Sequence, residues 1–157
     1  MDIEAISSKR PPLPVTVRTA MPSDAAGLVV LCAQADCYVD VADVAERLQH
    51  ITQRGGGMVL VAASDDTSIL GLLHVAPHYS LAAPPQADIR GLIVDVNSRR
   101  ARVGRALLGI AEVWARDHGM SLMQMHSNLV RDHADRFLGT LGYTHSCEQH
   151  LYRKTLA

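Results

Sequence analysis

A strand–turn–helix unit between residues 88 and 119 constrains the fold more than any other part of the sequence. The run from Asp88 to Val96 contains the apolar core Leu92-Ile93-Val94, which is typical of a buried strand. After a basic loop, apolar residues recur on one helical face, at Val103, Leu107, Ile110, Ala111 and Trp114. Gly119 is well placed to end this helix. The pattern predicts a long amphipathic helix that covers a sheet.

The segments on either side predict further strands and helices. We expect strands at 15–18, 58–63, 69–76 and 121–128, helices at 25–35, 41–54 and 133–141, and a terminal strand or hairpin within 144–156. Ser64 to Ser68 favours a tight turn, so the strands beside it form a hairpin. The order predicts an α/β (α+β) fold, in which a mixed, mostly antiparallel central sheet is flanked by about four helices. Residues 1–14, with three prolines, form a flexible arm, and residues 15–157 form a single domain.

Composition excludes several classes of partner. Fifteen basic against sixteen acidic residues give a net charge of −1, so no general field attracts nucleic acid. Only 4% of residues are aromatic, which leaves few platforms for stacked bases. The sequence has neither a signal peptide nor an apolar run of about 18 residues, so we expect a cytoplasmic protein without a membrane partner. The three cysteines lack zinc spacing, and we expect no metal.

The basic loop before the long helix indicates a site for an anion. Four arginines fall within seven residues, at positions 99, 100, 102 and 105. A helix N-terminus is itself positive, so cations there are disfavoured unless an anion joins them. Exposed backbone amides, the small Gly104 and the arginine side chains together would cradle a pyrophosphate. The alternative is a solvated basic loop before an ordinary helix.

Two segments resemble motifs of the GNAT superfamily of acyl-CoA-dependent N-acyltransferases. The first is Arg-x-x-Gly-x-Gly after a strand ending in Val-Asp, matched by Arg99 and Gly104, with Arg102 in place of the middle glycine. The second is Ser-Asn-x-x-Arg followed by Arg-Phe-Tyr-x-x-Leu-Gly-Tyr, matched over residues 127–143 with Leu138 in the tyrosine position. The resemblance spans residues 15–156 and is greatest to the branch that acetylates aminoalkylphosphonates and aminoglycosides.

The resemblance implies a cosubstrate, acetyl-CoA, and a direct transfer of acetyl to a primary amine of a small molecule. It places acetyl-CoA on Leu92, Ile93, Val94, Arg99, Arg100, Arg102, Val103, Gly104, Arg105 and Ala106. The strand backbone would pair with pantetheine, and the helix amides would hold the pyrophosphate. Leu138 has no proton to give to the departing thiolate, a role that water would then take. Similar proteins are frequently homodimers.

The acceptor side of the site is less defined by the sequence. Asp88 is the first candidate for the base that removes the amine proton, the alternative being an ordinary strand-end aspartate. Tyr38, His78 and Asn128 are candidates for binding the acceptor, each with a surface or loop-capping role as the alternative. His74 and His78 would lie about 13 Å apart on a strand, too far to share a metal ion.

Two other functions stay open at this level. One is a coenzyme A-binding or interaction module that has lost turnover. This alternative is based on Arg102 and Leu138, the two departures from the motifs. The other is an acetyltransferase that acts on protein N-termini or lysines. Binding of acetyl-CoA and release of thiol over a panel of amines and peptides separate the three.

Overall fold

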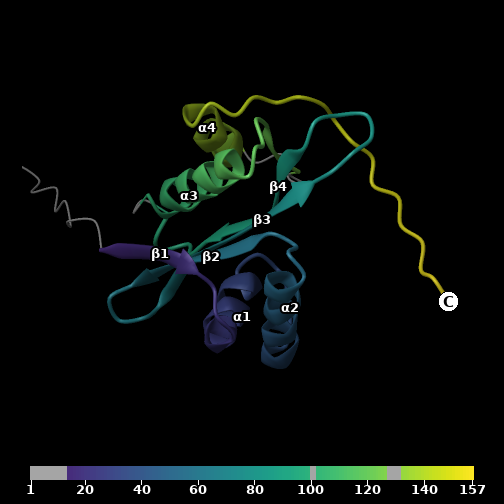
Figure 1. Cartoon of the computed structure of the whole chain (residues 1–157). Coiled ribbons are helices and arrows are strands. Elements are labelled where there is room, and N and C mark those ends of the chain that lie inside the picture. Colours follow the sequence, from purple (N-terminus) through teal and green to yellow (C-terminus); the bar gives the residue numbers. More distant parts are fainter. Residues whose placement is uncertain (1–13, 100–101, 127–131) are drawn as a thin grey trace, which may run out of the picture. The chain divides into compact units, whose positions relative to one another are not determined.

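The computed structural model describes residues 14–99, 102–126 and 132–157 (Figure 1). The chain divides into two compact units, one up to His126 and one from residue 127 onward. In the part that is described, no helix is both long and apolar enough to cross a membrane.

The first unit is built on a five-stranded sheet. The strands are β1 (Val15–Thr19), β2 (Met58–Ser64), β3 (Ile69–His78), β4 (Gln86–Val94) and β5 (Met123–Met125), and they lie in the order β1-β2-β3-β4-β5. Neighbours from β1 to β4 are antiparallel, whereas β5 runs parallel to β4. A parallel neighbour requires a crossover, which the long helix of the sequence pattern provides. The predicted mixed, mostly antiparallel sheet is confirmed.

Helices cover both faces of this sheet (Figure 1). A short 3-10 turn (Pro22–Asp24), α1 (Ala25–Ala33) and α2 (Val41–Gln53) lie on one face, and α3 (Val103–Asp117) lies on the other. The core beneath α1 and α2 contains Ala20, Leu28, Leu48, Val59 and Val61. Because both of its faces are covered, β2 is buried over five consecutive residues and reads as a continuous apolar run.

Gly71 sets how closely α3 approaches the other face. A Cβ atom at this position would lie 2.6 Å from Cγ1 of Val103 and 2.9 Å from Cδ1 of Leu107. Such distances are shorter than carbon atoms tolerate, so the first turns of α3 rest on β3 where it has no side chain. The start of α3 is thereby fixed beside the end of β4, whose Val94 pairs with Gly71.

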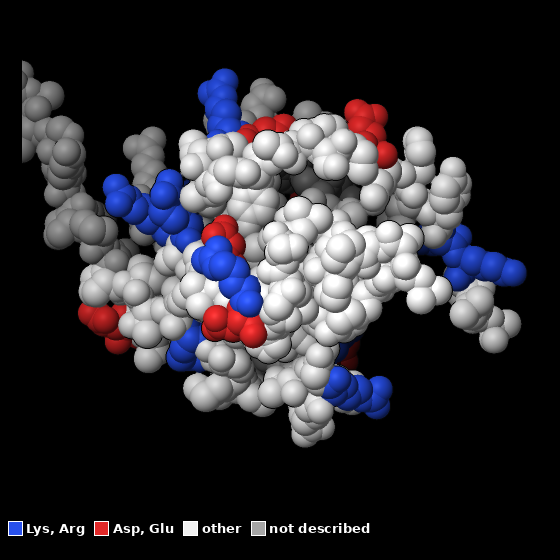
Figure 2. All heavy atoms as spheres, turned by 45° about the horizontal axis from the view of Figure 1, so that its top comes forward, with Lys and Arg blue, Asp and Glu red and all other residues white. Residues whose placement is uncertain are grey.

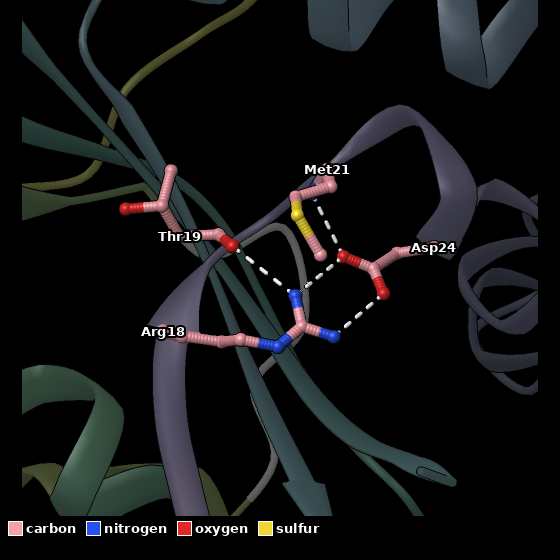
Figure 3. A network of polar contacts seen from close by, with 4 residues as sticks. All are labelled: Arg18, Thr19, Met21 and Asp24. Carbon is pink, nitrogen blue, oxygen red and sulfur yellow. Dashed lines mark hydrogen bonds and ion pairs between the residues drawn. The ribbon is translucent and has the colours of Figure 1, made fainter.

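An ion pair joins the end of β1 to the start of the helical layer (Figure 3). Nη1 and Nη2 of Arg18 contact Oδ2 and Oδ1 of Asp24 at 2.7 and 2.8 Å, and the Met21 amide donates to Oδ2 at 2.8 Å. The hydrogen bond from Arg18 lowers the pKa of Asp24, although burial of the carboxyl group acts in the opposite sense. The helix expected at 25–35 thus begins after a 3-10 turn whose Asp24 is bound to Arg18 of the preceding strand.

The second unit contains α4 (Asp132–Thr140). Gly142 follows it with φ +88°, and the amides of Gly142 and Tyr143 donate to the carbonyls of Gly139 and Leu138. This glycine ends the helix, which was expected at 133–141. The predicted strand or hairpin within 144–156 is wrong, because that segment contains neither helix nor strand. A strand needs a paired neighbour, and alternation of polar and apolar residues does not supply one.

Candidate active site

A bulge in β4 gives the site its shape. Gly91 pairs with His74 and Ile89 pairs with Val75, which leaves Arg90 as one extra residue on β4. On the other edge, β4 pairs with β5 only from Ala87 to Ile89. Among the described residues, the edge of β4 beyond Ile89 therefore has no partner strand. A bulge bends a strand, so β4 changes direction at this point.

The free edge of β4 runs through the apolar residues that the sequence singled out. Leu92, Ile93 and Val94 each pair with β3 on one side, and all three are half-buried. Their other edge offers backbone donors and acceptors at strand spacing, the geometry to which an extended chain adds as a further strand. A Cβ atom built on Gly91 would meet nothing within 4 Å, so there is open space beside the bulge.

Asp95 organises the turn between β4 and α3. Its Oδ2 accepts hydrogen bonds from the Asn97 amide at 3.1 Å and the Ser98 hydroxyl at 3.0 Å. Its Oδ1 accepts one from the side chain of Gln34 at 2.8 Å, and the Gln34 carbonyl in turn accepts from the Val96 amide at 3.0 Å. The bond from Gln34 contributes most to a lowered pKa of Asp95. The carboxylate thus holds the turn in one conformation.

Arg102 adopts a left-handed conformation at the start of α3. Its φ and ψ are 59° and 21°, a region that favours glycine. This explains why the related motif has glycine in this place, where the present chain has arginine. The backbone keeps the conformation despite the side chain, which is exposed along with those of Arg99 and Arg105.

The remaining residues of the turn are arranged as a helix N-terminus requires. Val103 and Gly104 are buried, Ala106 is exposed, and the Ala106 amide donates to the Arg102 carbonyl at 3.0 Å. The amides before Ala106 belong to the first turn, which has no helical acceptors for them. Arg100 lies outside the described residues. On the face drawn in Figure 2, basic and acidic side chains are intermixed. Any binding of an anion would therefore depend on the turn before α3 and not on a broad basic surface.

Comparison with known proteins identifies the family. The model of the acetyltransferase (GNAT) family matches residues 30–143, which is most of the chain. The chain belongs to the GNAT acetyltransferase family. The curated "uncharacterized N-acetyltransferase YhdJ" of Bacillus subtilis (strain 168) is 30% identical to this acetyltransferase over 117 residues, covering 74% of the chain and 80% of the relative.

Solved structures share the fold. A "transcriptional regulator" from Bacillus halodurans C-125 superposes with a TM-score of 0.79 at 22% identity, over 90% of this chain and 100% of that one. The aminoglycoside N-acetyltransferase AAC(6')-Iy, in complex with CoA, also gives 0.79, at 16% identity over 94% and 99% of the two chains. At these identities the likeness concerns the fold alone.

The acetyltransferase places the predicted acceptor-side residues in different surroundings. Asp88 lies on β4, two residues before the bulge, and His78 ends β3, two residues beyond the Ala76 that pairs with Asp88. Tyr38 is 79% exposed in the connection from α1 to α2, and no described contact joins it to Asp88. Asn128 lies outside the described residues. Of the two candidates that the structure describes, His78 is thus the one that the sheet register brings near Asp88.

Asp88 is surrounded by groups that can bear positive charge. Arg90 Nε lies 3.8 Å from Oδ2 of Asp88, and His126 Nε2 lies 3.7 Å from Oδ1. Both distances are too long for hydrogen bonds. The Asp88 side chain is 14% exposed, and its Oδ1 is buried with no hydrogen-bond partner among the described residues.

His74 belongs to this site and was assessed in the sequence only as a metal ligand. It pairs with Gly91 at the bulge, and its Nε2 is buried without a described hydrogen-bond partner. Burial lowers the pKa of His74, while a hydrogen bond with the backbone of Gly56 acts in the opposite sense. A histidine inside the apolar strand 69–76 was the available signal, but its position opposite a bulge depends on strand register. In the described part of the chain, no three His, Cys, Asp or Glu side chains are placed to hold a metal ion.

Proposed function

We propose that this acetyltransferase uses acetyl-CoA and transfers acetyl directly to a primary amine of a small molecule. The observation that carries the proposal is the free edge of β4, which leads from the bulge beside Asp88 to the turn that begins α3. This arrangement offers strand-type pairing, helix amides and an acidic group along one path. The CoA complex of AAC(6')-Iy, a neighbour in fold, supports both the cosubstrate and the acceptor class.

The residues along this path fit acetyl-CoA. The backbone of Leu92, Ile93 and Val94 would pair with the pantetheine amides. The amides of the first turn of α3, before Ala106, would bind the pyrophosphate, and the exposed side chains of Arg99, Arg102 and Arg105 lie close enough in sequence to reach its rim. Arg100 is proposed as a further contact to acetyl-CoA only because of its place in the motif. When bound, acetyl-CoA supplies an acetyl group activated as a thioester.

The transfer needs a base for the amine proton, donors for the carbonyl oxygen and a proton for the thiolate. Asp88 takes the proton that the amine must lose, directly or through water. Backbone N–H groups at the bulge donate to the carbonyl oxygen on which negative charge develops. Leu138 cannot protonate the leaving thiolate, but a thiol pKa of about 8.5 makes that thiolate a good leaving group, so water suffices. His78 and Tyr38 are proposed to contact the acceptor, together with Asn128.

The experiment combines calorimetry with acetyl-CoA and a thiol-release assay over aminoglycosides, polyamines, aminoalkylphosphonates and lysine-containing peptides. We expect binding of acetyl-CoA and faster thiol release with one class of small amine than with any peptide. Binding without release for all of them would contradict the proposed turnover. Release with peptides alone would contradict the acceptor class.

A matched pair of variants tests where acetyl-CoA binds. Gly104→Val places a side chain at the buried start of α3, whereas Gly109→Val adds one on the same helix where a Cβ atom meets nothing within 4 Å. We expect Gly104→Val to lose acetyl-CoA binding while circular dichroism shows a folded protein, and Gly109→Val to bind normally. Equal affinity of both variants would contradict the proposed cradle.

A further inference from the structure

Two buried polar atoms beside the bulge of β4 make no hydrogen bond to the described residues. They are Nε2 of His74 and Oδ1 of Asp88, the two buried side-chain atoms of the described residues that lack a hydrogen-bond partner. Ala76 pairs with Asp88, and His74 is two residues from Ala76, so both side chains project from the same face of the sheet. The charge of Asp88 acts directly on His74.

The backbone around His74 indicates which of its nitrogens is the acceptor. An interaction with the backbone of Gly56 raises the pKa of His74, as donation from the ring to a carbonyl does. Since Nε2 has no hydrogen-bond partner among the described residues, we assign this donation to Nδ1. In the neutral ring Nδ1 then carries the hydrogen, and Nε2 presents a lone pair.

The glycine-rich connection before β2 holds this arrangement in place. Gly57 has φ +114°, and a Cβ atom on it would lie 2.1 Å from the Val75 carbonyl oxygen. A side chain is therefore excluded, and the connection packs directly on β3 next to His74. The same connection brings the backbone of Gly56 near the ring of His74.

No described neighbour supplies the missing donor. Arg90 and His126 are the groups facing Asp88 that bear N–H donors, and they stay 3.8 and 3.7 Å away. The charges that act on His74 are those of Arg90 and Asp88. Leaving buried acceptors unpaired is costly, and a ligand with two or more N–H groups would satisfy both. The open space at Gly91, the residue paired with His74, gives such a ligand room.

We propose that His74 Nε2 and Asp88 Oδ1 together bind the amino group of the acceptor molecule. This rests on the proposed function and adds His74 to the catalytic residues. An ammonium group donates one hydrogen to each atom. The proton in the hydrogen bond to Asp88 is transferred to the carboxylate, which becomes a carboxylic acid. A second N–H of the amine stays hydrogen-bonded to Nε2 of His74. The neutral nitrogen then has a free lone pair, which forms the bond to the acetyl carbon. The thioester C–S bond breaks, and the second proton that the nitrogen loses reaches the departing thiolate through water.

Two substitutions separate the acceptor atom from the rest of the histidine. His74→Gln keeps an acceptor near the position of Nε2 but does not titrate. His74→Asn keeps a donor near the position of Nδ1, for Gly56, and loses the acceptor. We expect kcat/KM to fall about 10-fold to 100-fold in His74→Asn, as for the loss of one hydrogen bond to a charged group, and less than 3-fold in His74→Gln. Equal effects of the two variants would show a structural role only and overturn the proposal.

The pH profile gives a second readout. In the wild type, protonation of His74 turns Nε2 from an acceptor into a donor, so kcat/KM falls as pH drops through the lowered pKa of His74, below the ordinary imidazole value of about 6.5. The part of this acid limb that follows the titration of His74 should disappear in His74→Gln and remain in the control His50→Gln, an exposed residue of α2. Persistence in His74→Gln would overturn the proposal.

Titration of the His74 ring by NMR tests the pair without turnover. Because the Asp88 carboxylate raises the pKa of His74, Asp88→Asn should lower it, and a saturating acceptor amine should lower it in the wild type. An unchanged His74 pKa in Asp88→Asn overturns the pair itself. If Asp88→Asn lowers the pKa of His74 but no amine causes thiol release, the proposed function is contradicted. The acceptor amine as the ligand of this pair is then contradicted too. Thiol release with unaltered kcat/KM in His74→Asn overturns the inference on His74 alone.

Discussion

The side chain of Gln34, just after α1, forms a closed ring of hydrogen bonds with Asp95 at the end of β4. Its amide donates to Oδ1 of Asp95 at 2.8 Å, and its carbonyl accepts from the Val96 amide at 3.0 Å. One side chain thus satisfies both the carboxylate and the backbone of the turn that precedes α3. The helical layer on one face of the sheet is in this way tied to the turn that we propose binds the pyrophosphate.

Gln34→Ala should therefore loosen the turn. We expect a loss of about 1 kcal/mol in the free energy of unfolding, because both bonds are exposed. The affinity for acetyl-CoA should fall about 3-fold to 10-fold, since the amides must be ordered when the ligand binds. Urea titration and calorimetry measure the two quantities. Gln53→Ala, which removes an exposed glutamine at the last position of α2, is the control. Unchanged affinity in Gln34→Ala would refute the role of this ring.

The backbone at Arg102 is strained, so one substitution there should raise the free energy of unfolding instead of lowering it. Arg102→Gly should raise the free energy of unfolding by about 1 kcal/mol, because an L-residue in the left-handed region pays a cost that glycine avoids. Arg102→Ala loses the same charge without relieving the strain, so its stability should not rise. If the guanidinium contacts the pyrophosphate, both variants weaken acetyl-CoA binding equally. Urea midpoints in which Arg102→Gly is no more stable than Arg102→Ala would argue against the strain.

The sequence predicts the parts of the site that depend on local periodicity. The strand to Val94 and the helix from Val103 follow from apolar spacing, and the observed β4 and α3 agree with them. The resemblance to acetyltransferases also gave the family correctly. The Gln34–Asp95 contact joins residues 61 positions apart, and no local pattern encodes it.

The bulge shows the same limit. Gly91 inside the strand is compatible with a bulge but does not establish one, and the bulge decides that His74 pairs with Gly91 and shares a face with Asp88. Register depends on which strands pair, and that is a property of the whole sheet. His74 was therefore overlooked as a partner of Asp88, although Asp88 itself was selected from its place on the strand.

The Arg18–Asp24 pair predicts a dependence of stability on pH. The pKa of Asp24 is lowered in the folded state, so its contribution is complete above the unfolded pKa of about 4 and is lost as pH falls through the folded value. At pH 7, Asp24→Asn should lose about 1 to 3 kcal/mol in the free energy of unfolding, as for hydrogen bonds to a charged group. The difference between wild type and variant should shrink below pH 4 in urea titrations. A difference that stays constant with pH would mean that the charge contributes nothing.

Asp88→Asn tests the proposed base. The amide keeps the size of the side chain but cannot accept a proton, so kcat should fall about 10²-fold to 10⁴-fold. The affinity for acetyl-CoA should stay within about 2-fold, because the free edge of β4 and the turn before α3 lie beyond the bulge from Asp88. Asp65→Asn, in the exposed turn between β2 and β3, is the matched control and should keep wild-type turnover. Thiol release and calorimetry on both variants decide the matter, because an Asp88→Asn enzyme as fast as Asp65→Asn would remove Asp88 from the mechanism.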